Sequence, residues 1–286
     1  MFDSLETAIE KYLKAGYFDY SASSLKLSET PFDIVYLENC LSLLNQSYGK
    51  NLQSINVNGT IRSDSVNIYF IERDPERLFT AFKGNCAYTG YRNIIICDLL
   101  YVNEWQSLPN NERPIWQTLA GKRATAEDEE FGFAMVKALR MNFVLWILGH
   151  EIGHLAHGHL KNHYAFGAKG SEFTINNFDG RGSKEEQEAD EFMVEAATGG
   201  VAEVFYLTLS DIITQYQNKY VEEQGLAPSF LNGNQKIVLR ATSSTHPPFL
   251  LRAINLFLLL NKKYVLERSS EPLHFERLKE HIVVLQ

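Results

Sequence analysis

The sequence predicts an α+β fold that is mostly helical, with a small mixed sheet beside a buried helix. Apolar residues recur at helical spacing over most of the second half of the chain, whereas strand-forming residues gather between 51 and 100. The chain has 286 residues, 45% of them hydrophobic, which is enough to bury a full core. We predict an N-terminal helical segment, residues 1–50, and a main domain, residues 51–286.

Helices are expected where apolar residues recur every three or four positions. Pro31 and Asp33 give a start signal for the second of these helices. The third is apolar on nearly every face, so it should lie buried near the centre of the fold. The ranges with helical periodicity are, in chain order, 2–15, 33–46, 127–159, 201–223, 247–262 and 271–284.

Strand signals lie in two stretches of the first half. Residues 51–72 are rich in Asn, Ser and β-branched residues, which predicts one or two strands with a turn at Asn58-Gly59. Residues 81–100 carry further strand signal, and residues 103–126 are expected to form an irregular connection. The glycine-rich stretch 167–182 is expected to be a mobile loop that is able to cover a site.

The most informative motif is His150-Glu151-Ile152-Gly153-His154, an HExxH sequence inside the third predicted helix. Four residues make just over one helical turn, so the two imidazoles project from one face and can hold one cation. Glu151 lies beside them, placed to take a proton from a metal-bound water. The alternative, on this pentapeptide alone, is a buried helix whose two histidines bond to backbone groups.

A zinc hydrolase usually has a third protein ligand, commonly a carboxylate further along the chain. The acidic run 184–192 begins another helical segment, in which Glu186 and Asp190 share a face that Glu188 and Glu191 do not. We predict Glu186 as the third ligand and Asp190 as the carboxylate that accepts the free N–H of a ligating histidine. The alternative for this run is a solvated helix start, where acids are also favoured.

A further histidine, His246, precedes Pro247 and Pro248. The proline after it keeps His246 out of the helical region, and such a fixed position suits a group that donates a hydrogen bond to a developing oxyanion. We therefore predict a catalytic role for His246. The segment also starts a helix with Thr245 as its cap, which is compatible with that role.

Together these motifs resemble the metallopeptidase family that contains the CAAX prenyl proteases and the bacterial peptidase HtpX, a gluzincin group. The likeness spans residues 66–260. The matching motifs are 150–154 followed by His159, then 186–190, then 245–248 followed by Arg252. The resemblance implies a zincin-like fold and a bound Zn²⁺, with Glu186 as third ligand, Asp190 as the aspartate of the ExxxD motif, and His246 near the metal.

The resemblance extends to the segments upstream of the metal motif. Residues 67–72, 81–90 and 93–97 resemble the strands and turn that form the family's substrate-binding edge, which implies that Ala81, Gly84 and Asn85 bind substrate. Two features depart from the family: the interval between the HExxH and ExxxD motifs is short, and the membrane spans of well-known members are missing. A weaker resemblance, in size, solubility and the HEIGH pentapeptide, is to the Lit-type phage-exclusion peptidases.

The remaining histidines near the motif, and the cysteines, are predicted to have structural roles. His157, His159 and His163 follow the metal motif and are expected to be solvated, although a second metal is the alternative; in the resembling family His159 would be a packing residue. The odd number of widely spaced cysteines in apolar surroundings predicts reduced, buried thiols. These cysteines are Cys40, Cys86 and Cys97.

Charge and hydropathy exclude other classes. The formal net charge of −8 and the absence of a block of basic residues argue against a nucleic-acid-binding surface. The longest apolar runs, 141–148 and 256–260, are far shorter than the roughly 20 residues that span a bilayer. Residues 1–16 carry acids and no apolar core of signal-peptide length, so we expect a soluble, cytoplasmic protein.

The function that the sequence predicts is that of a zinc-dependent endopeptidase acting on a protein or peptide substrate. One alternative is a regulated phage-defence or stress peptidase with a single cellular target. Another, from a different class, is a zinc-stabilised binding protein that does not cleave, although a scaffold of that kind has no need of the base Glu151.

Overall fold

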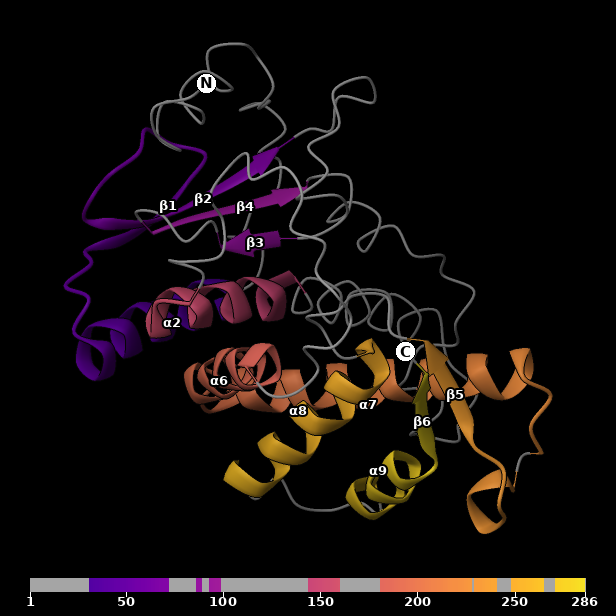
Figure 1. Ribbon diagram of the computed structural model, residues 1–286. Coiled ribbons are helices and arrows are strands. Elements are labelled where there is room, and N and C mark those ends of the chain that lie inside the picture. The colour runs from indigo at the N-terminus through magenta and orange to yellow at the C-terminus, as the bar shows by residue number, and fades with distance from the viewer. Residues whose placement is uncertain are drawn as a thin grey trace, which may run out of the picture. The chain divides into compact units, whose positions relative to one another are not determined.

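The computed structural model shows two compact units, Met1–Gly170 and Ser171–Gln286, which are described separately below (Figure 1). The residues that the structure describes are 31–71, 86–88, 93–98, 144–159, 181–227, 229–240, 248–264 and 271–285. The predicted helix 2–15 and the predicted connection 103–126 lie outside them. None of the described helices is long and apolar enough to span a bilayer. The α+β class is confirmed, whereas the predicted division at residue 50 stays a prediction.

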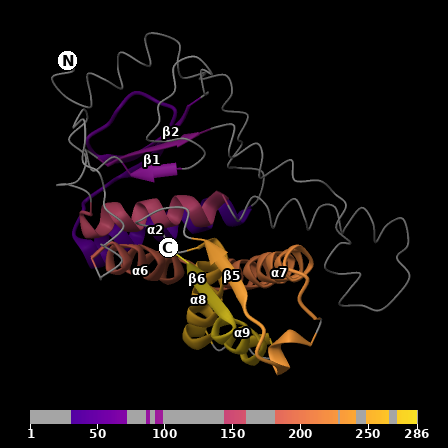
Figure 2. The same ribbon diagram turned by 45° about the vertical axis from the view of Figure 1, so that its right-hand side comes forward.

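The first unit combines two described helices with a four-stranded sheet. Helix α2, Pro31–Tyr48, begins at the proline that predicted its start, and it buries residues spaced four apart: Tyr36, Cys40 and Leu44. The helix that carries the HExxH motif, residues 144–157, is called the HExxH helix below. Figures 1 and 2 show the sheet on one side of these two helices.

The sheet has the strand order β1-β2-β4-β3. Strands β1 (Ser54–Val57), β2 (Ser65–Ile71) and β4 (Ile94–Asp98) are parallel, and β3 (Cys86–Tyr88) pairs antiparallel with β4. The predicted small mixed sheet is therefore present. The described residues of strands β2 and β4 are buried on both faces, and one face of β2 carries the buried polar residues Ser65 and Asn67. Strand β3 lies at one edge.

The connection between β1 and β2 differs from the usual form of an Asn-Gly turn. The predicted turn is present, with Asn58 at a φ of 49°, but the strands that it joins are parallel and form no hairpin. Asparagine side chains satisfy the backbone of this short connection. Asn67 accepts a hydrogen bond from the Arg62 N–H at 3.0 Å, donates to the Arg62 carbonyl at 2.8 Å, and accepts from the Asn56 side chain at 2.8 Å.

The prediction of three reduced cysteines is wrong for two of them. Cys86 of β3 and Cys97 of β4 are partners in the antiparallel register and form a disulfide. Their separation of 11 residues in the chain hides this pairing, because it depends on how the two strands align. Cys40 is a free thiol, and burial raises its pKa to about 12, so it stays protonated.

The second unit is built from helices around an aromatic core. These helices are α6 (Arg181–Ala196), α7 (Gly200–Glu223), the short helix η3 (Phe230–Asn232), α8 (Phe249–Tyr264) and α9 (Glu271–Glu280). Phe257 of α8 is fully buried and contacts Tyr206 of α7 and Phe275 of α9, with ring centroids 4.3 and 4.7 Å away. These contacts join three helices at one point.

Two predictions at the ends of this unit need correction. Helix α6 begins at Arg181, inside the stretch predicted as a loop, most of which lies outside the described residues. The last predicted helix ends early, because Ile282–Leu285 forms strand β6, which pairs in parallel with β5, Ile237–Arg240 (Figure 2). The run Ile-Val-Val-Leu is rich in β-branched side chains, which favour a strand over a helix.

Candidate metal centre

The HExxH helix is buried almost throughout. Apolar residues occupy nearly all of its faces, and Leu145, Leu148 and Ile152 are fully buried. The helix ends at Gly158, whose φ of 69° is the left-handed conformation that commonly terminates helices at glycine. The burial of residues 144–156 confirms the prediction of a buried helix for this part of the chain, and it holds the polar side chains of the motif in fixed positions.

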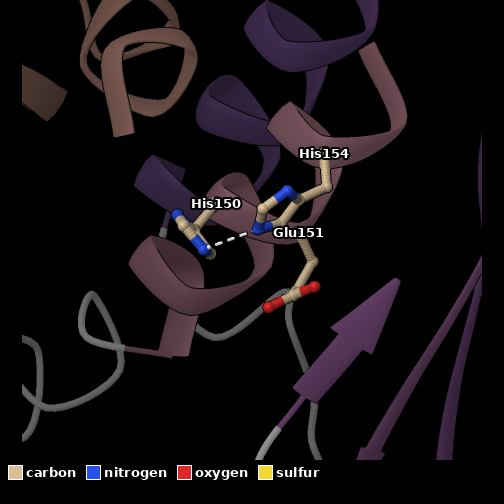
Figure 3. Close-up of side chains that lie close together, drawn as sticks. All are labelled: His150, Glu151 and His154. Atoms are coloured by element: carbon tan, nitrogen blue, oxygen red, sulfur yellow. Dashed lines mark hydrogen bonds between the residues drawn. The ribbon is translucent and has the colours of Figure 1, made fainter. Parts of the chain in front are cut away.

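His150 and His154 face each other from one side of this helix (Figure 3). Their Nε2 atoms are 3.0 Å apart, and their ring centroids are 4.6 Å apart with the planes nearly perpendicular. Both imidazoles are buried, at 3% and 4% exposure. Together with Glu151 they form a buried group whose ligand atoms lie within 4.8 Å of one another. The i, i+4 spacing therefore places both imidazoles on one face of the helix, as predicted.

These two nitrogens fit a single metal ion. Nitrogens that bind zinc at 2.0–2.1 Å in a tetrahedral arrangement lie about 3.3 Å apart, close to the 3.0 Å between the two Nε2 atoms. Two bare lone pairs at this distance repel each other, so either one ring donates an N–H to the other or a metal ion lies between them. The described residues thus fit a metal that prefers imidazole ligands.

Glu151 points from the helix toward the sheet (Figure 3). Its Oε2 accepts a hydrogen bond of 2.6 Å from the backbone N–H of Tyr88 in β3, across 63 residues of chain. Because an N–H has one hydrogen, the amide of Tyr88 is directed away from β4 and toward the helix. Among the described residues, no hydrogen-bond donor to the other oxygen, Oε1, is present.

Tyr88 is a contact that the sequence did not predict. The disulfide to β4 lies two residues before it, so the segment that carries the Tyr88 amide is covalently attached to the sheet. Burial raises the pKa of the Tyr88 phenol, so this side chain is neutral at physiological pH. The signal for this contact was present only as the strand pattern around residue 86, which does not reveal what the strand faces.

The structure also assigns a contact to His159, which was predicted to be solvated. His159 is buried, and its Nδ1 lies 3.0 Å from Nδ1 of His154. His157 is exposed as predicted, and its Nε2 lies 3.2 Å from the hydroxyl of Tyr48. The prediction of solvation is therefore wrong for His159, because the chain reverses at Gly158 and brings residue 159 back over the helix.

In the second unit, the predicted acids of α6 lie with an arginine of α8. Arg252 Nη2 donates to Asp190 Oδ1 at 2.9 Å, and Nη1 lies 3.7 Å from Glu186 Oε2. All three side chains are largely buried. Glu186 and Asp190 thus lie on the same face of α6, as predicted. Arg252 neutralises part of the negative charge of these two acids. Their predicted roles as ligand and as partner of a histidine stay predictions.

Several predicted site residues lie outside the described part of the chain. This holds for the candidate oxyanion donor and for the candidate substrate-binding residues, which are His246, Ala81, Gly84 and Asn85.

No protein-family model matches the chain, and no curated protein or solved structure matches it either. The resemblance to the gluzincin peptidases therefore rests on the motifs alone and stays a prediction.

Proposed function

We propose that this protein is a zinc-dependent endopeptidase. One observation carries the proposal: a single turn of a buried helix directs two imidazole nitrogens at one point, 3.0 Å apart, with a glutamate beside them. A purely structural pair of histidines needs no carboxylate at that position. An HExxH group with this geometry is suited to hold a metal and to handle the proton of a water bound to it.

The proposed ligands are His150, His154 and Glu186. Glu186 is favoured over Asp190 because Arg252 bonds to Asp190 at 2.9 Å, whereas it lies 3.7 Å from Glu186. Two imidazoles and one carboxylate, with a fourth position for water, form a common ligand set for catalytic zinc. Asp190, held by Arg252, is proposed to accept the N–H of a ligating histidine.

The chain's own groups divide the chemistry among them. A bound zinc ion supplies a water of lowered pKa and polarises the peptide carbonyl. Glu151, which the Tyr88 amide orients through Oε2, would act as the general base that takes a proton from the attacking water and passes it to the leaving amine. His246 is proposed to donate a hydrogen bond to the developing oxyanion.

Strand β3 supports the proposal of an extended peptide as substrate. Its outer edge carries the Tyr88 N–H, which faces Glu151 instead of β4. Because Glu151 already takes the Tyr88 N–H, a peptide that adds to this edge would pair with other backbone groups of the strand, and it would lie beside the catalytic group. Ala81, Gly84 and Asn85 are proposed to continue that edge. The cytoplasmic location stays a prediction, and the Cys86–Cys97 disulfide is unusual for that compartment.

Comparison of wild type with Glu151→Gln tests the proposal. Because the amide keeps the shape of the side chain but cannot act as a base, turnover should fall by about 10²- to 10⁴-fold, while zinc content stays unchanged. The measurement is proteomic labelling of new N-termini after each protein is expressed in the same cells. New N-termini that appear only with wild type support a peptidase; equal sets with both proteins would contradict it.

A further inference from the structure

The helix end places His159 against a proposed metal ligand. The N–H of Gly158 donates to the Leu155 carbonyl at 3.2 Å, and the N–H of His159 donates to the His154 carbonyl at 2.9 Å. With Gly158 at a φ of 69°, these two bonds form a Schellman motif, in which residue 159 folds back over residue 154. An apolar pair usually occupies these two positions, but here both are histidines.

The side chains of this pair also meet. The Nδ1 atoms of His154 and His159 are 3.0 Å apart, and both rings are buried, at 4% and 8% exposure. His154 Nε2 faces His150 at the same distance. Both nitrogens of His154 therefore have a neighbour, one on the side of the proposed metal and one on the side of the helix end.

The number of N–H groups on the rings of His154 and His159 then determines which ring donates the hydrogen bond between them. A neutral imidazole has one N–H, and a metal bound at Nε2 of His154 needs the lone pair of that atom. The proton of His154 must then be on Nδ1, where it is donated to Nδ1 of His159. His159 must keep a lone pair on Nδ1 and hold its own proton on Nε2. Each ring is thus limited to one tautomer.

The ring of His159 is itself held from its other face. His157 stacks on it with centroids 5.1 Å apart and planes 12° apart, and the hydroxyl of Tyr48 in α2 contacts His157 Nε2 at 3.2 Å. The ring of His159 thus has His154 at its edge and His157 on one face, and this leaves it little freedom to turn its Nδ1 away from His154.

We propose that His159 is a positioning residue, whose Nδ1 accepts the Nδ1–H of His154 and so fixes the tautomer and orientation in which His154 binds the metal. Carboxylates and carbonyls usually have this role in metal sites. The inference rests on the metal site proposed above and deepens it. It assigns to His159 a function that its burial and its place after the motif do not by themselves reveal.

Three variants of His159 separate the hydrogen bond from the packing. His159→Phe keeps a ring that can stack on His157 but has no acceptor. His159→Asn places an amide oxygen near the position of Nδ1, and His159→Gln places its amide near the position of Nε2. The measured quantity is the zinc dissociation constant, from competition with a chromophoric chelator, and the melting temperature of the metal-free protein reports folding.

The Phe and Gln variants should bind zinc about 10- to 100-fold more weakly than wild type, and Asn should stay close to wild type. His157→Phe keeps a ring that can stack on His159 and changes no nitrogen of His154 or His159, so the dissociation constant should stay close to that of wild type. Nitrogen-15 NMR of zinc-bound wild type should show His154 protonated on Nδ1 and His159 on Nε2.

A folded Phe variant that binds zinc as tightly as wild type, or the opposite tautomers, would overturn the inference and leave the proposed function standing. If the Phe variant does not fold, the comparison of Asn with Gln decides, and equal affinities would overturn the inference. A wild type that binds no zinc would overturn both proposals.

Discussion

The HExxH helix and the acidic cluster of the second unit hold their polar groups in different ways. In the HExxH helix the contacts are local: His150, His154 and His159 meet within ten residues of chain, through one helical turn and one helix end. In the second unit, Glu186 and Asp190 on α6 meet Arg252, more than 60 residues later on α8. One arrangement depends on helix geometry, the other on how two helices pack.

This difference separates two kinds of electrostatics. An imidazole can be neutral, so the two histidines tolerate burial without a counter-ion. A cation bound between their Nε2 atoms would stabilise them further. Two buried carboxylates repel each other unless a cation lies between them, and Arg252 provides that charge. We therefore expect metal binding to depend on the two imidazoles together with Glu186, the proposed third ligand, and the stability of the second unit to depend on the arginine.

The largest expected effect tests whether the two regions share one metal. If Glu186 is the third ligand, Glu186→Ala should remove most of the zinc, because two imidazoles alone are an incomplete set. Glu185→Ala, one residue earlier on the same helix, should keep zinc near the wild-type level. Elemental analysis of the purified variants measures this. If Glu186→Ala keeps its zinc, the two regions act independently and the ligand set is wrong.

A smaller effect is expected from the arginine. Arg252→Leu leaves two buried acids without their cation, and breaking a buried pair in this way typically costs about 3–5 kcal/mol. Urea denaturation of the metal-free protein measures the free energy of unfolding. Lys184→Leu is the matched control, because Lys184 pairs with Glu188 at 3.3 Å from a mostly exposed position, and such a pair should contribute less than about 1 kcal/mol. Equal losses in both variants would contradict the role assigned to Arg252.

The sequence predicted those parts of the fold that depend on local spacing. The start of α2 at Pro31, the range of α7 and the burial of the HExxH helix follow from periodicity and start signals. Three features depend on how separate strands pair with each other, and these were missed or misjudged: the parallel register of β1 with β2, the β5–β6 sheet and the Cys86–Cys97 disulfide.

The candidate site shows the same limit. The i, i+4 spacing of His150 with His154, and of Glu186 with Asp190, predicted which side chains share a face. It did not predict that Tyr88 would hold Glu151, because that bond joins a strand to a helix across 63 residues. The contact of His159 with His154 had a local signal, the glycine between two histidines at 157–159, which is typical of a helix that ends and reverses.

The central claim is that His150 and His154 together hold one metal ion. Zinc content per chain, measured by elemental analysis after gentle purification without chelators, tests it most directly, with His150→Ala and His154→Ala beside the wild type. We predict about one zinc per chain in wild type and a near-complete loss in each variant, because each removes one of the three proposed protein ligands. Wild-type protein without a transition metal above background, or variants that retain as much zinc as wild type, would contradict the account.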